Sequence, residues 1–403
     1  MHSKKRLFLV GIAPDLTKRA VLRAKQMNYE VIVGETPTEM QKNRALVEAA
    51  DQVIEVNIND FNALYSVAEQ LHHEKKIDGM YTFREFSSEP TAKVIEKLGL
   101  YGLPFDVVEA CNDKFKTKAN FEKQGVLSAK YQLCSTLEEV EDFFKSIAAP
   151  IIIKPLKMQG SLGVFKITKE EEIHLFFERC KTEGNDGVVL AEEFIEGQEI
   201  SFEVVVCNGK VYVLGVTEKL LFPGTFVERG HTTAYESEVL DAEDFQNIAE
   251  NIVKAASVFF GAMFIEGFVT PKGFYCGEIH TRYGGDQIST ITELGNKYDL
   301  ITPIFSELMG EVVEVVPVGE REISGARFIS AKPGKIVEIE GVEAIKRMDG
   351  VHSIDLYCQV GNVVNELCWN RDRLGCVVAK APSREALESI FNDVFNVLRI
   401  ETV

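Results

Sequence analysis

The stretch from Phe264 to Asp286 reads Phe-Ile-Glu-Gly-Phe-Val-Thr, then Pro-Lys-Gly, then Phe-Tyr-Cys-Gly-Glu-Ile-His-Thr-Arg-Tyr-Gly-Gly-Asp. Its central Pro-Lys-Gly is turn-forming and separates two runs rich in aromatic and β-branched residues, a pattern that predicts a β-hairpin. If the turn centres on Lys272, Glu266 lies directly opposite Glu278. Directly opposed side chains in an antiparallel pair have Cβ atoms about 5 Å apart.

The two-residue period of a strand places His280 and Arg282 on the same face as Glu278. Two carboxylates this close repel each other unless a cation lies between them. Mg²⁺ prefers one or two carboxylates together with phosphate oxygens, so this face suits a magnesium site. The same residues would also make an ordinary exposed polar face, and the hairpin alone does not decide between these interpretations.

The composition is that of a globular protein, with 403 residues, 45% apolar and 26% charged residues. This length predicts about two to four domains. The net charge of −18 argues against a general affinity for nucleic acid or anionic membranes, and leaves room for a local basic pocket. The 8 scattered cysteines form no Cys-x-x-Cys pair, which indicates reduced thiols in a cytoplasmic protein. No stretch approaches the ~20 apolar residues of a membrane helix.

Short strands and helices alternate over the first hundred residues. Strands are expected at 7–12, 30–34, 52–56 and 79–83, and helices at 15–28, 60–73 and 88–98. This alternation predicts a doubly wound parallel sheet, an α/β fold. The first turn, at 11–14, lacks the three-glycine dinucleotide fingerprint, so we expect no nicotinamide or flavin site there.

Two lysines stand out in the next segment. Lys114 begins a helix that Asp113 is expected to cap. Lys154 ends the apolar run 151–153, and a lysine at the end of a buried strand must either extend to solvent or meet an anion. The loop at 157–164 contains two glycines and a serine, so its N–H groups could cradle phosphate, although a plain hairpin loop is the alternative.

The remaining elements are expected from hydrophobic pattern and turn residues. Asn-Gly at 208–209 predicts a hairpin, and the stretch from 220 to 235 is expected to be an irregular, functional loop. The expected strands are 188–195, 199–206, 211–217, 336–340, 353–360 and 375–380; helices are expected at 113–124, 242–260, within 286–309, and at 383–398.

The order of the motifs resembles that of the ATP-grasp ligases. The set comprises Asn-Asp-Lys at 112–114, Ile-Ile-Lys-Pro at 152–155, Gly-Ser-x-Gly-Val at 160–164, Glu-Glu-Phe-Ile-Glu-Gly at 192–197, Glu-x-Ser at 199–201, Glu266, and Glu-x-x-x-Arg-x-Gly-Gly at 278–285. Each motif is weak and the ordered set is strong; it covers residues 5–310. The C-terminal stretch resembles the terminal domain of the L-amino-acid ligase branch, at Ala-Arg-Phe 326–328 and at the turns near 350 and 361.

The resemblance implies a domain division. The expected parts are an N-terminal α/β domain at 1–110, a two-lobed α+β ATP-grasp domain at 111–310 with a small lobe at about 128–197, and a small C-terminal α+β domain at 311–403. The cofactors implied are ATP and Mg²⁺. Small-molecule carboxylate and amine substrates are expected as partners, with no nucleic acid and no membrane, and a homodimer is possible.

The resemblance also implies roles for individual residues. For the nucleotide they are Lys114 and Lys154 on the phosphates, with Lys154 also near the adenine; Gln159, Gly160, Ser161 and Gly163 in a loop over the β- and γ-phosphates; Glu192, Glu193, Phe194 and Ile195 as the adenine hinge; and Glu199 on the ribose. For the chemistry they are Glu266 and Glu278 on Mg²⁺, Arg282 on the charged intermediate, Glu228 and His231 in the amino-acid pocket, and Gly284 and Gly285 near the substrate.

Two residues depart from the family pattern. His280 stands where asparagine is usual, and Mg²⁺ prefers oxygen to imidazole, so a second metal position is in doubt. Asp286 stands where a bulky residue can narrow the substrate pocket in relatives. It could pair with a substrate ammonium or cap the following helix, and the cap is the favoured interpretation.

The reaction implied is ATP-dependent amide formation through an acyl phosphate, with an amino acid as one substrate. The loops at 159–163 and 220–235 would exclude water from that intermediate. The alternatives are a carboxylase that makes carboxyphosphate, and a nucleotide-binding module without turnover. The intact set of Lys154, Glu266, Glu278 and Arg282 argues against the second.

Overall fold

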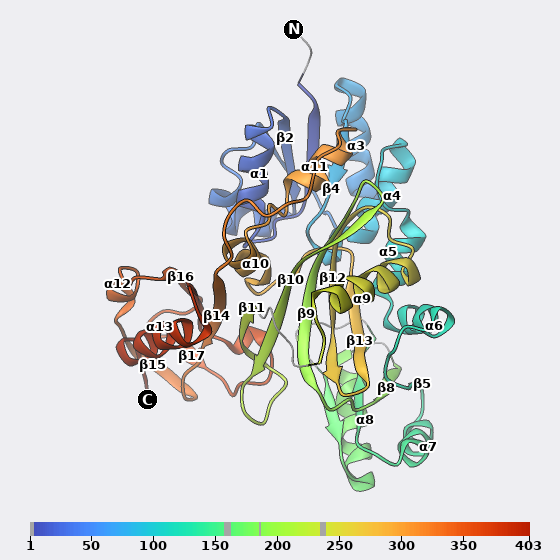
Figure 1. Ribbon diagram of the computed structural model, residues 1–403, viewed down its shortest axis with the longest axis vertical. Coiled ribbons are helices and arrows are strands. Elements are labelled where there is room, and N and C mark those ends of the chain that lie inside the picture. Colours follow the sequence, from blue (N-terminus) through green and yellow to red (C-terminus); the bar gives the residue numbers. More distant parts are fainter. Residues whose placement is uncertain (1–3, 157–162, 185–186, 234–238) are drawn as a thin grey trace.

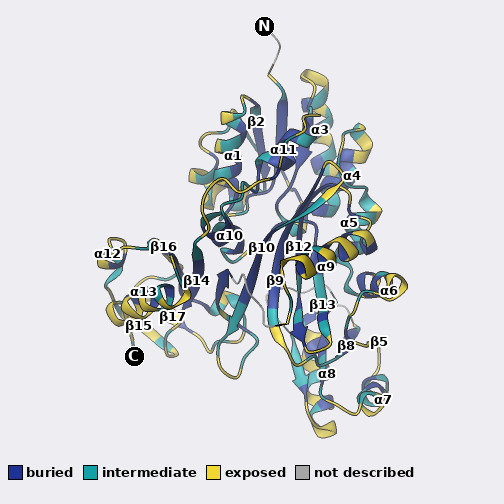
Figure 2. Ribbon diagram, viewed as in Figure 1, coloured by how far each residue is buried: buried dark blue, intermediate teal, exposed yellow. Residues whose placement is uncertain are grey.

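The computed structural model describes residues 4–156, 163–184, 187–233 and 239–403. Figure 1 shows an N-terminal α/β part at the top in blue, a lobe with β8 and α7 at the bottom, and the C-terminal elements at the left in red. The sheets are dark with buried residues and the outer faces of the helices carry the exposed ones (Figure 2). Across the described ranges, no helix combines the length and apolar character needed to span a membrane.

The N-terminal sheet is parallel, as predicted, with the strand order β3-β2-β1-β4. Its elements are β1 Arg6–Val10, α1 Thr17–Gln26, β2 Glu30–Glu35, α2 Pro37–Lys42, β3 Gln52–Glu55, α3 Phe61–Glu74, β4 Gly79–Tyr81 and α4 Ser88–Leu98. Alternate residues of β1 pack on opposite sides, Leu7 and Leu9 against α1 and Phe8 and Val10 against α3 and α4. Both faces are therefore covered, as parallel sheets require. The short helix α2 was not predicted.

The small lobe is a separate sheet with the order β5-β8-β6-β7. It contains β5 Tyr131–Cys134, α7 Leu137–Ile147, β6 Ile151–Lys154, β7 Phe165–Ile167, α8 Ile173–Gly184 and β8 Val189–Glu193. The helices α7 and α8 bury Val140, Phe143 and Phe177 against the sheet. Helices α5 Phe105–Asn112 and α6 Lys114–Gln124 precede the lobe. The Asp113 side chain accepts from two backbone N–H groups of α6, so the predicted cap is confirmed.

The largest sheet has the order β13-β12-β9-β10-β11-β14-β18-β16. Its strands are β9 Gln198–Cys207, β10 Lys210–Leu221, β11 Glu228–Thr233, β12 Gly261–Thr270, β13 Gly273–His280, β14 Ile323–Ile329, β16 Val351–Leu356 and β18 Gly375–Ala381. The prediction of an irregular loop at 220–235 was wrong in its extent, because β10 continues to Leu221 and β11 pairs with both β10 and β14. Neighbouring strands buried this polar segment, which its own sequence pattern did not indicate.

The C-terminal strands β14, β18 and β16 extend this same sheet instead of forming a separate one. The other elements are α9 Ala242–Ala255, α10 Ile288–Asn296, α11 Thr302–Leu308, β15 Gly334–Glu340, α12 Val342–Ile345, β17 Val363–Val364, α13 Arg384–Val397 and β19 Arg399–Thr402. Strands β14, β17 and β19 and helix α12 were not predicted. The division of the chain at 110 and 310 stays a prediction.

The predicted hairpin is formed by β12 and β13, and Glu266 faces Glu278. Thr270 pairs with Gly273, which leaves a two-residue turn instead of one centred on Lys272. Continued without interruption, that register would place Glu266 opposite Gly277. A bulge shifts the register by one residue between Gly267 and Glu266. The facing pair is thus confirmed, although the bulge that produces it was not predicted.

Candidate active site

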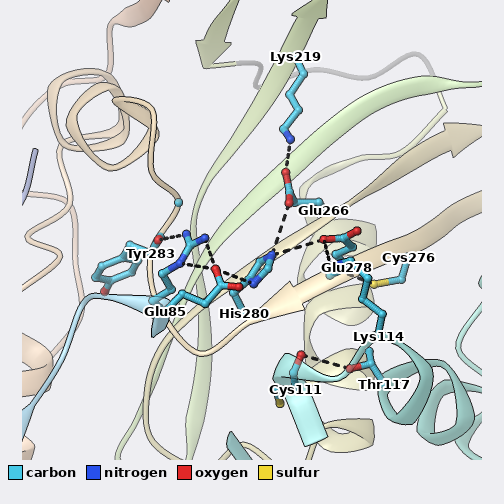
Figure 3. A network of polar contacts seen from close by, with 12 residues as sticks. Glu85, Cys111, Lys114, Thr117, Lys219, Glu266, Cys276, Glu278, His280 and Tyr283 are labelled. Carbon is cyan, nitrogen blue, oxygen red and sulfur yellow. Dashed lines mark hydrogen bonds and ion pairs between the residues drawn. The ribbon is translucent and has the colours of Figure 1, made fainter. Parts of the chain in front are cut away.

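A cavity of about 1800 Å³ lies where the N-terminal part, the small lobe, the large sheet and the C-terminal segment meet. Glu85, Lys154, Glu278 and Arg373 line it, one from each of these parts. Among the residues on its wall, the polar contacts drawn in Figure 3 join Lys219, Glu266, His280, Glu278 and Glu85 into a continuous network.

The carboxylate pair at the centre of this network is the candidate metal site. Ligand atoms of Glu266, Glu278 and His280 all lie within 4.8 Å of one another. Burial opposes ionisation of Glu266, but Lys219 and His280 lower its pKa to about 2. Burial likewise opposes ionisation of Glu278, but Lys114 and Lys154 hold its pKa below the ordinary value. Two ionised carboxylates are the oxygen donors that Mg²⁺ takes, so these residues fit that ion.

His280 lies between the two carboxylates and is held by a residue of the N-terminal part. Its Nε2 is 3.7 Å from Glu266 and 3.8 Å from Glu278, and its Nδ1 is 3.2 Å from Glu85. Burial lowers the pKa of His280, but Glu85 and Glu266 raise it overall to about 9. An imidazolium ion donates hydrogen bonds and binds no metal, so in the metal-free protein the charged form of His280 partly neutralises the pair.

The two predicted phosphate lysines lie together on the same carboxylate. Lys154 Nζ is 3.0 Å from Glu278 and 2.9 Å from Glu192, and Lys114 Nζ is 3.7 Å from Glu278. Glu192 also pairs with the buried Lys118 at 2.9 Å. The Glu192 side chain is therefore occupied with two lysines.

The remaining predicted nucleotide residues are only partly described. Glu193, Phe194, Ile195 and Glu199 line the cavity, so the structure brings the predicted hinge and ribose residues to the same cavity. Gln159, Gly160 and Ser161 lie outside the described residues. Gly163 has a φ of +73°, and a Cβ there would lie 2.9 Å from Pro155. Only glycine suits this positive φ and close approach.

Lys219 contacts the other oxygen of Glu266, the one that does not face His280. Only 5% of its side chain is exposed, and its ammonium forms an ion pair with Glu266 Oε1. The same nitrogen is 3.3 Å from Glu199 and 3.7 Å from Glu228. Burial lowers the pKa of Lys219, but Glu266 and the other two carboxylates raise it well above the ordinary value. One ammonium thus joins the predicted ribose, metal and amino-acid residues.

Glu228 and His231 lie on β11, beside Lys219. His231 pairs directly across the sheet with Lys219, and its ring packs edge-on against Phe328. Within the described structure, Glu228 Oε2 and both ring nitrogens of His231 are buried without a hydrogen-bond partner. Burial and the charge of Lys219 hold the pKa of His231 well below 6.5, so the imidazole is neutral. A neutral imidazole without a partner can accept a hydrogen bond from a bound group.

Arg282 is held in place by Glu85 and by the backbone. Its Nε and Nη2 donate to Glu85 Oε2 at 3.0 and 2.5 Å, and Nη1 donates to the Tyr283 carbonyl at 2.8 Å. In the loop that follows, Gly284 N–H donates to the fully buried Glu203 at 2.9 Å. A Cβ on Gly284 would lie 2.6 Å from the Phe264 ring, so a larger residue does not fit. Gly285 also lines the cavity.

The favoured interpretation of Asp286 as a helix cap was wrong. The N-cap of α10 is Gln287, without a side-chain hydrogen bond, whereas Asp286 accepts from Arg373 Nη2 at 2.8 Å with both oxygens and from Asn370 at 3.2 Å. Arg373 has only 4% of its side chain exposed. A charge-assisted bond to a buried guanidinium is stronger than a bond to a helix N–H, which explains the choice. The pair forms a wall of the cavity between α10 and the C-terminal segment.

Sequence reasoning missed Glu85, Lys219, Lys118, Glu203 and Arg373. Glu85 follows β4, and residues beyond the carboxyl ends of parallel strands commonly reach a ligand site, so its position carried a signal. Lys219 lies near the end of β10, in a strand predicted to end two residues earlier. The other three are identified only by their tertiary contacts.

Replacing His280 with asparagine tests the charge network through stability in metal-free buffer. The folded-state pKa of His280 lies above that of the free side chain, so its contribution to stability is complete below about 6.5 and is lost as pH rises through about 9. Wild type should exceed His280→Asn by a few degrees in melting temperature near pH 6, and the gap should close near pH 10. An equal gap at both pH values, measured by calorimetry with a chelator present, would contradict this assignment.

Three family models match separate parts of the chain. The model of the ATP-grasp N-terminal domain matches residues 22–102, that of the ATP-grasp domain matches residues 147–291, and that of the L-amino acid ligase C-terminal domain 2 matches residues 327–403.

Curated relatives and a solved structure agree with these matches. Alanine–anticapsin ligase of Bacillus subtilis (strain 168) is 30% identical over 200 residues, which are 44% of this chain and 42% of that protein. L-arginine-specific L-amino acid ligase of Bacillus subtilis is 23% identical over 278 residues, 66% of each protein. The match thus spans less than half of the first of these relatives. The crystal structure of L-amino acid ligase from Bacillus licheniformis has the same fold, with a TM-score of 0.83, 21% identity and 100% coverage of both chains.

Proposed function

Because the chain belongs to the ATP-grasp family of ATP-dependent ligases, we propose that it joins a carboxylate to an amine, with an amino acid as one substrate. The observation that carries this proposal is the facing pair of Glu266 and Glu278, with Lys114 and Lys154 against Glu278 and Arg282 lining the same cavity. Such a set suits a magnesium triphosphate and the negative charge that develops during phosphoryl transfer.

The proposed reaction has two steps. A carboxylate oxygen of the first substrate attacks the γ-phosphorus of ATP, the bond to the β-phosphate oxygen breaks, and ADP and an acyl phosphate result. The amine then attacks the carbonyl carbon, the carbon–oxygen bond to phosphate breaks, and the amine loses a proton. ATP is needed because a carboxylate is a poor electrophile until it carries a leaving group.

The residues of the cavity divide this work. Lys114 and Lys154 would hold the phosphates, and Glu266 and Glu278 would hold Mg²⁺. When bound, Mg²⁺ would neutralise charge on the transferring phosphoryl group. Arg282 would stabilise the oxyanion that forms during attack by the amine. Glu228 would orient the amine, and neutral His231 would take its proton, since Glu228 Oε2 and both ring nitrogens of His231 are buried without a hydrogen-bond partner in the described structure.

A phosphate-release assay tests the function directly. Purified protein with ATP and MgCl₂ is incubated with pairs of amino acids and small carboxylic acids, and the products are identified by mass spectrometry. Phosphate release that depends on both substrates, with a product lighter than their sum by one water, supports the ligase. Release that depends on bicarbonate alone indicates the carboxylase, and binding of nucleotide without release under any condition indicates a non-catalytic module.

Replacing His231 with alanine should lower amide formation by about a hundredfold, because a general base commonly contributes at least that much. ATP binding should change little, since no described contact joins His231 to the lysines near Glu278. Initial rates of product formation and nucleotide titrations measure the two effects. Equal losses in both would mean that His231 supports the fold of the site instead of the proton transfer.

The proposal extends to the cellular compartment and the oligomeric state of the protein. All eight cysteines are free thiols, which suits a reducing compartment, and we propose a cytoplasmic enzyme acting on small molecules. The homodimer stays a prediction that light scattering coupled to gel filtration would test.

A further inference from the structure

The ammonium of Lys219 lies where three carboxylates with different proposed tasks converge. It pairs with Glu266 and lies 3.3 Å from Glu199 and 3.7 Å from Glu228. Its side chain is nearly buried, so the three acids and not water provide its surroundings. None of the phosphate-binding or proton-transfer tasks proposed above employs this lysine. Three acids and one base leave the cluster with an excess of negative charge.

The partner of Lys219 is also one of the two proposed metal carboxylates. A divalent ion on Glu266 would lie a few ångströms from the ammonium, and like charges at that distance repel strongly in a partly buried site. The ammonium and the metal therefore compete for the same carboxylate. The Lys219 ammonium can nevertheless pair with other carboxylates, since Glu199 and Glu228 are already within 3.7 Å of it. In addition, Glu228 Oε2 is buried without a hydrogen-bond partner in the described structure.

We propose that Lys219 is a built-in counter-cation for the metal site, which neutralises Glu266 in the metal-free protein and is displaced onto Glu199 and Glu228 when the divalent ion binds. This inference rests on the metal site of the proposed function. It makes Lys219 a positioning residue that connects metal loading to the amine side. The displaced ammonium would hold Glu228 as a charged hydrogen-bond acceptor. His231, which lies directly opposite Lys219 in the pairing of β10 and β11, is close by on the same strand as Glu228.

The test is metal affinity without nucleotide or substrate, with Mn²⁺ as the probe. Free Mn²⁺ is followed by electron paramagnetic resonance, and Mg²⁺ is added to confirm competition at the same site. In Lys219→Met the competing charge is gone, so Mn²⁺ should bind about tenfold more tightly than in wild type. If Lys219 only braces the site, its loss would loosen Glu266, and affinity would fall or stay the same. Either of those outcomes overturns the proposal.

Two controls distinguish direct competition between Lys219 and the metal for Glu266 from the long-range effect that loss of any positive charge would have on Mn²⁺ affinity. Lys118→Met removes another buried lysine, which pairs with Glu192 and, in the described part of the chain, contacts neither metal carboxylate; it should change Mn²⁺ affinity by less than about threefold. Repeating the titrations at high salt screens distant charges more than buried contacts. The tightening in Lys219→Met should persist there, and its disappearance would contradict direct competition.

A second variant keeps the proposal testable if Lys219→Met does not fold. Glu228→Gln removes one of the two carboxylates that would receive the ammonium, so displacement becomes less favourable and Mn²⁺ should bind about threefold or more weakly. Unchanged affinity in this variant would refute the transfer. Because no step involves turnover, these results stand apart from the phosphate-release assay: a protein that fails as a ligase can still show the competition, and a working ligase can lack it.

Discussion

A Glu278→Gln variant should lose ATP-dependent amide formation by about a thousandfold or more, because an ion-binding charge at the reacting phosphate is replaced by a neutral amide. Glu278 is the carboxylate that contacts Lys114, Lys154 and His280 together. Its replacement removes a metal ligand and the carboxylate that lies 3.7 Å from the Lys114 ammonium. Product formation under saturating ATP measures the loss, and circular dichroism checks that the variant is folded.

Two further variants make this result specific. Glu278→Asp keeps the charge on a shorter side chain and should retain more activity than the glutamine variant. Glu109→Gln removes a partly exposed carboxylate that pairs with Lys116 and should keep wild-type activity. If Glu278→Gln retained a tenth or more of the activity, the carboxylate pair would not be the metal site, and the proposed mechanism would fail with it.

An Arg282→Met variant should lower kcat by about a hundredfold to a thousandfold with little change in ATP affinity. Arg282 donates to Glu85 through two nitrogens, a geometry that requires a guanidinium group. Arg282→Lys should therefore rescue only a small part of the rate, although it restores the positive charge. Single-turnover rates and nucleotide titrations separate the two quantities, and a loss confined to ATP affinity would contradict the assignment.

Glu85 offers a test of how this arginine is held. If Glu85 acts through Arg282, the double variant Glu85→Gln with Arg282→Met should be no slower than Arg282→Met alone. Glu85 also contacts His280, so the single Glu85→Gln variant should additionally lower the pKa of that histidine. Multiplied losses in the double variant would mean that Glu85 has a separate role.

Elements with strong local patterns were predictable from the sequence. The apolar strand β1 and its neighbours in the parallel sheet are examples, since burial on both faces selects continuous β-branched and aliphatic residues. Strand β11 was not predictable, because its Glu-Arg-Gly-His-Thr-Thr sequence is polar. It becomes a strand because β10 and β14 pair with both of its edges, and those pairings lie far from it in the chain or depend on a bulge.

The residues of the candidate site likewise fall into those that local sequence could place and those that it could not. The hairpin that carries Glu266 and Glu278 is a local structure and could be read from the sequence, whereas the bulge that brings the two residues face to face could not. The contact between Glu85 and Arg282 joins residues 197 positions apart, and that between Asp286 and Arg373 joins residues 87 positions apart. No local pattern encodes such pairs. They arise from how the N-terminal and C-terminal parts pack on the central sheet.

The pairing of β14 with β11 has a consequence for biosynthesis. While the ribosome is still making the last part of the protein, β11 already exists but one of its edges has no neighbour. An open edge invites pairing with other nascent chains until β14 emerges to cover it. The strand that bears Glu228 and His231 therefore gains its second neighbour late in synthesis. A prematurely terminated polypeptide would expose the unpaired edge of β11, which favours aggregation, and its catalytic centre would be incomplete.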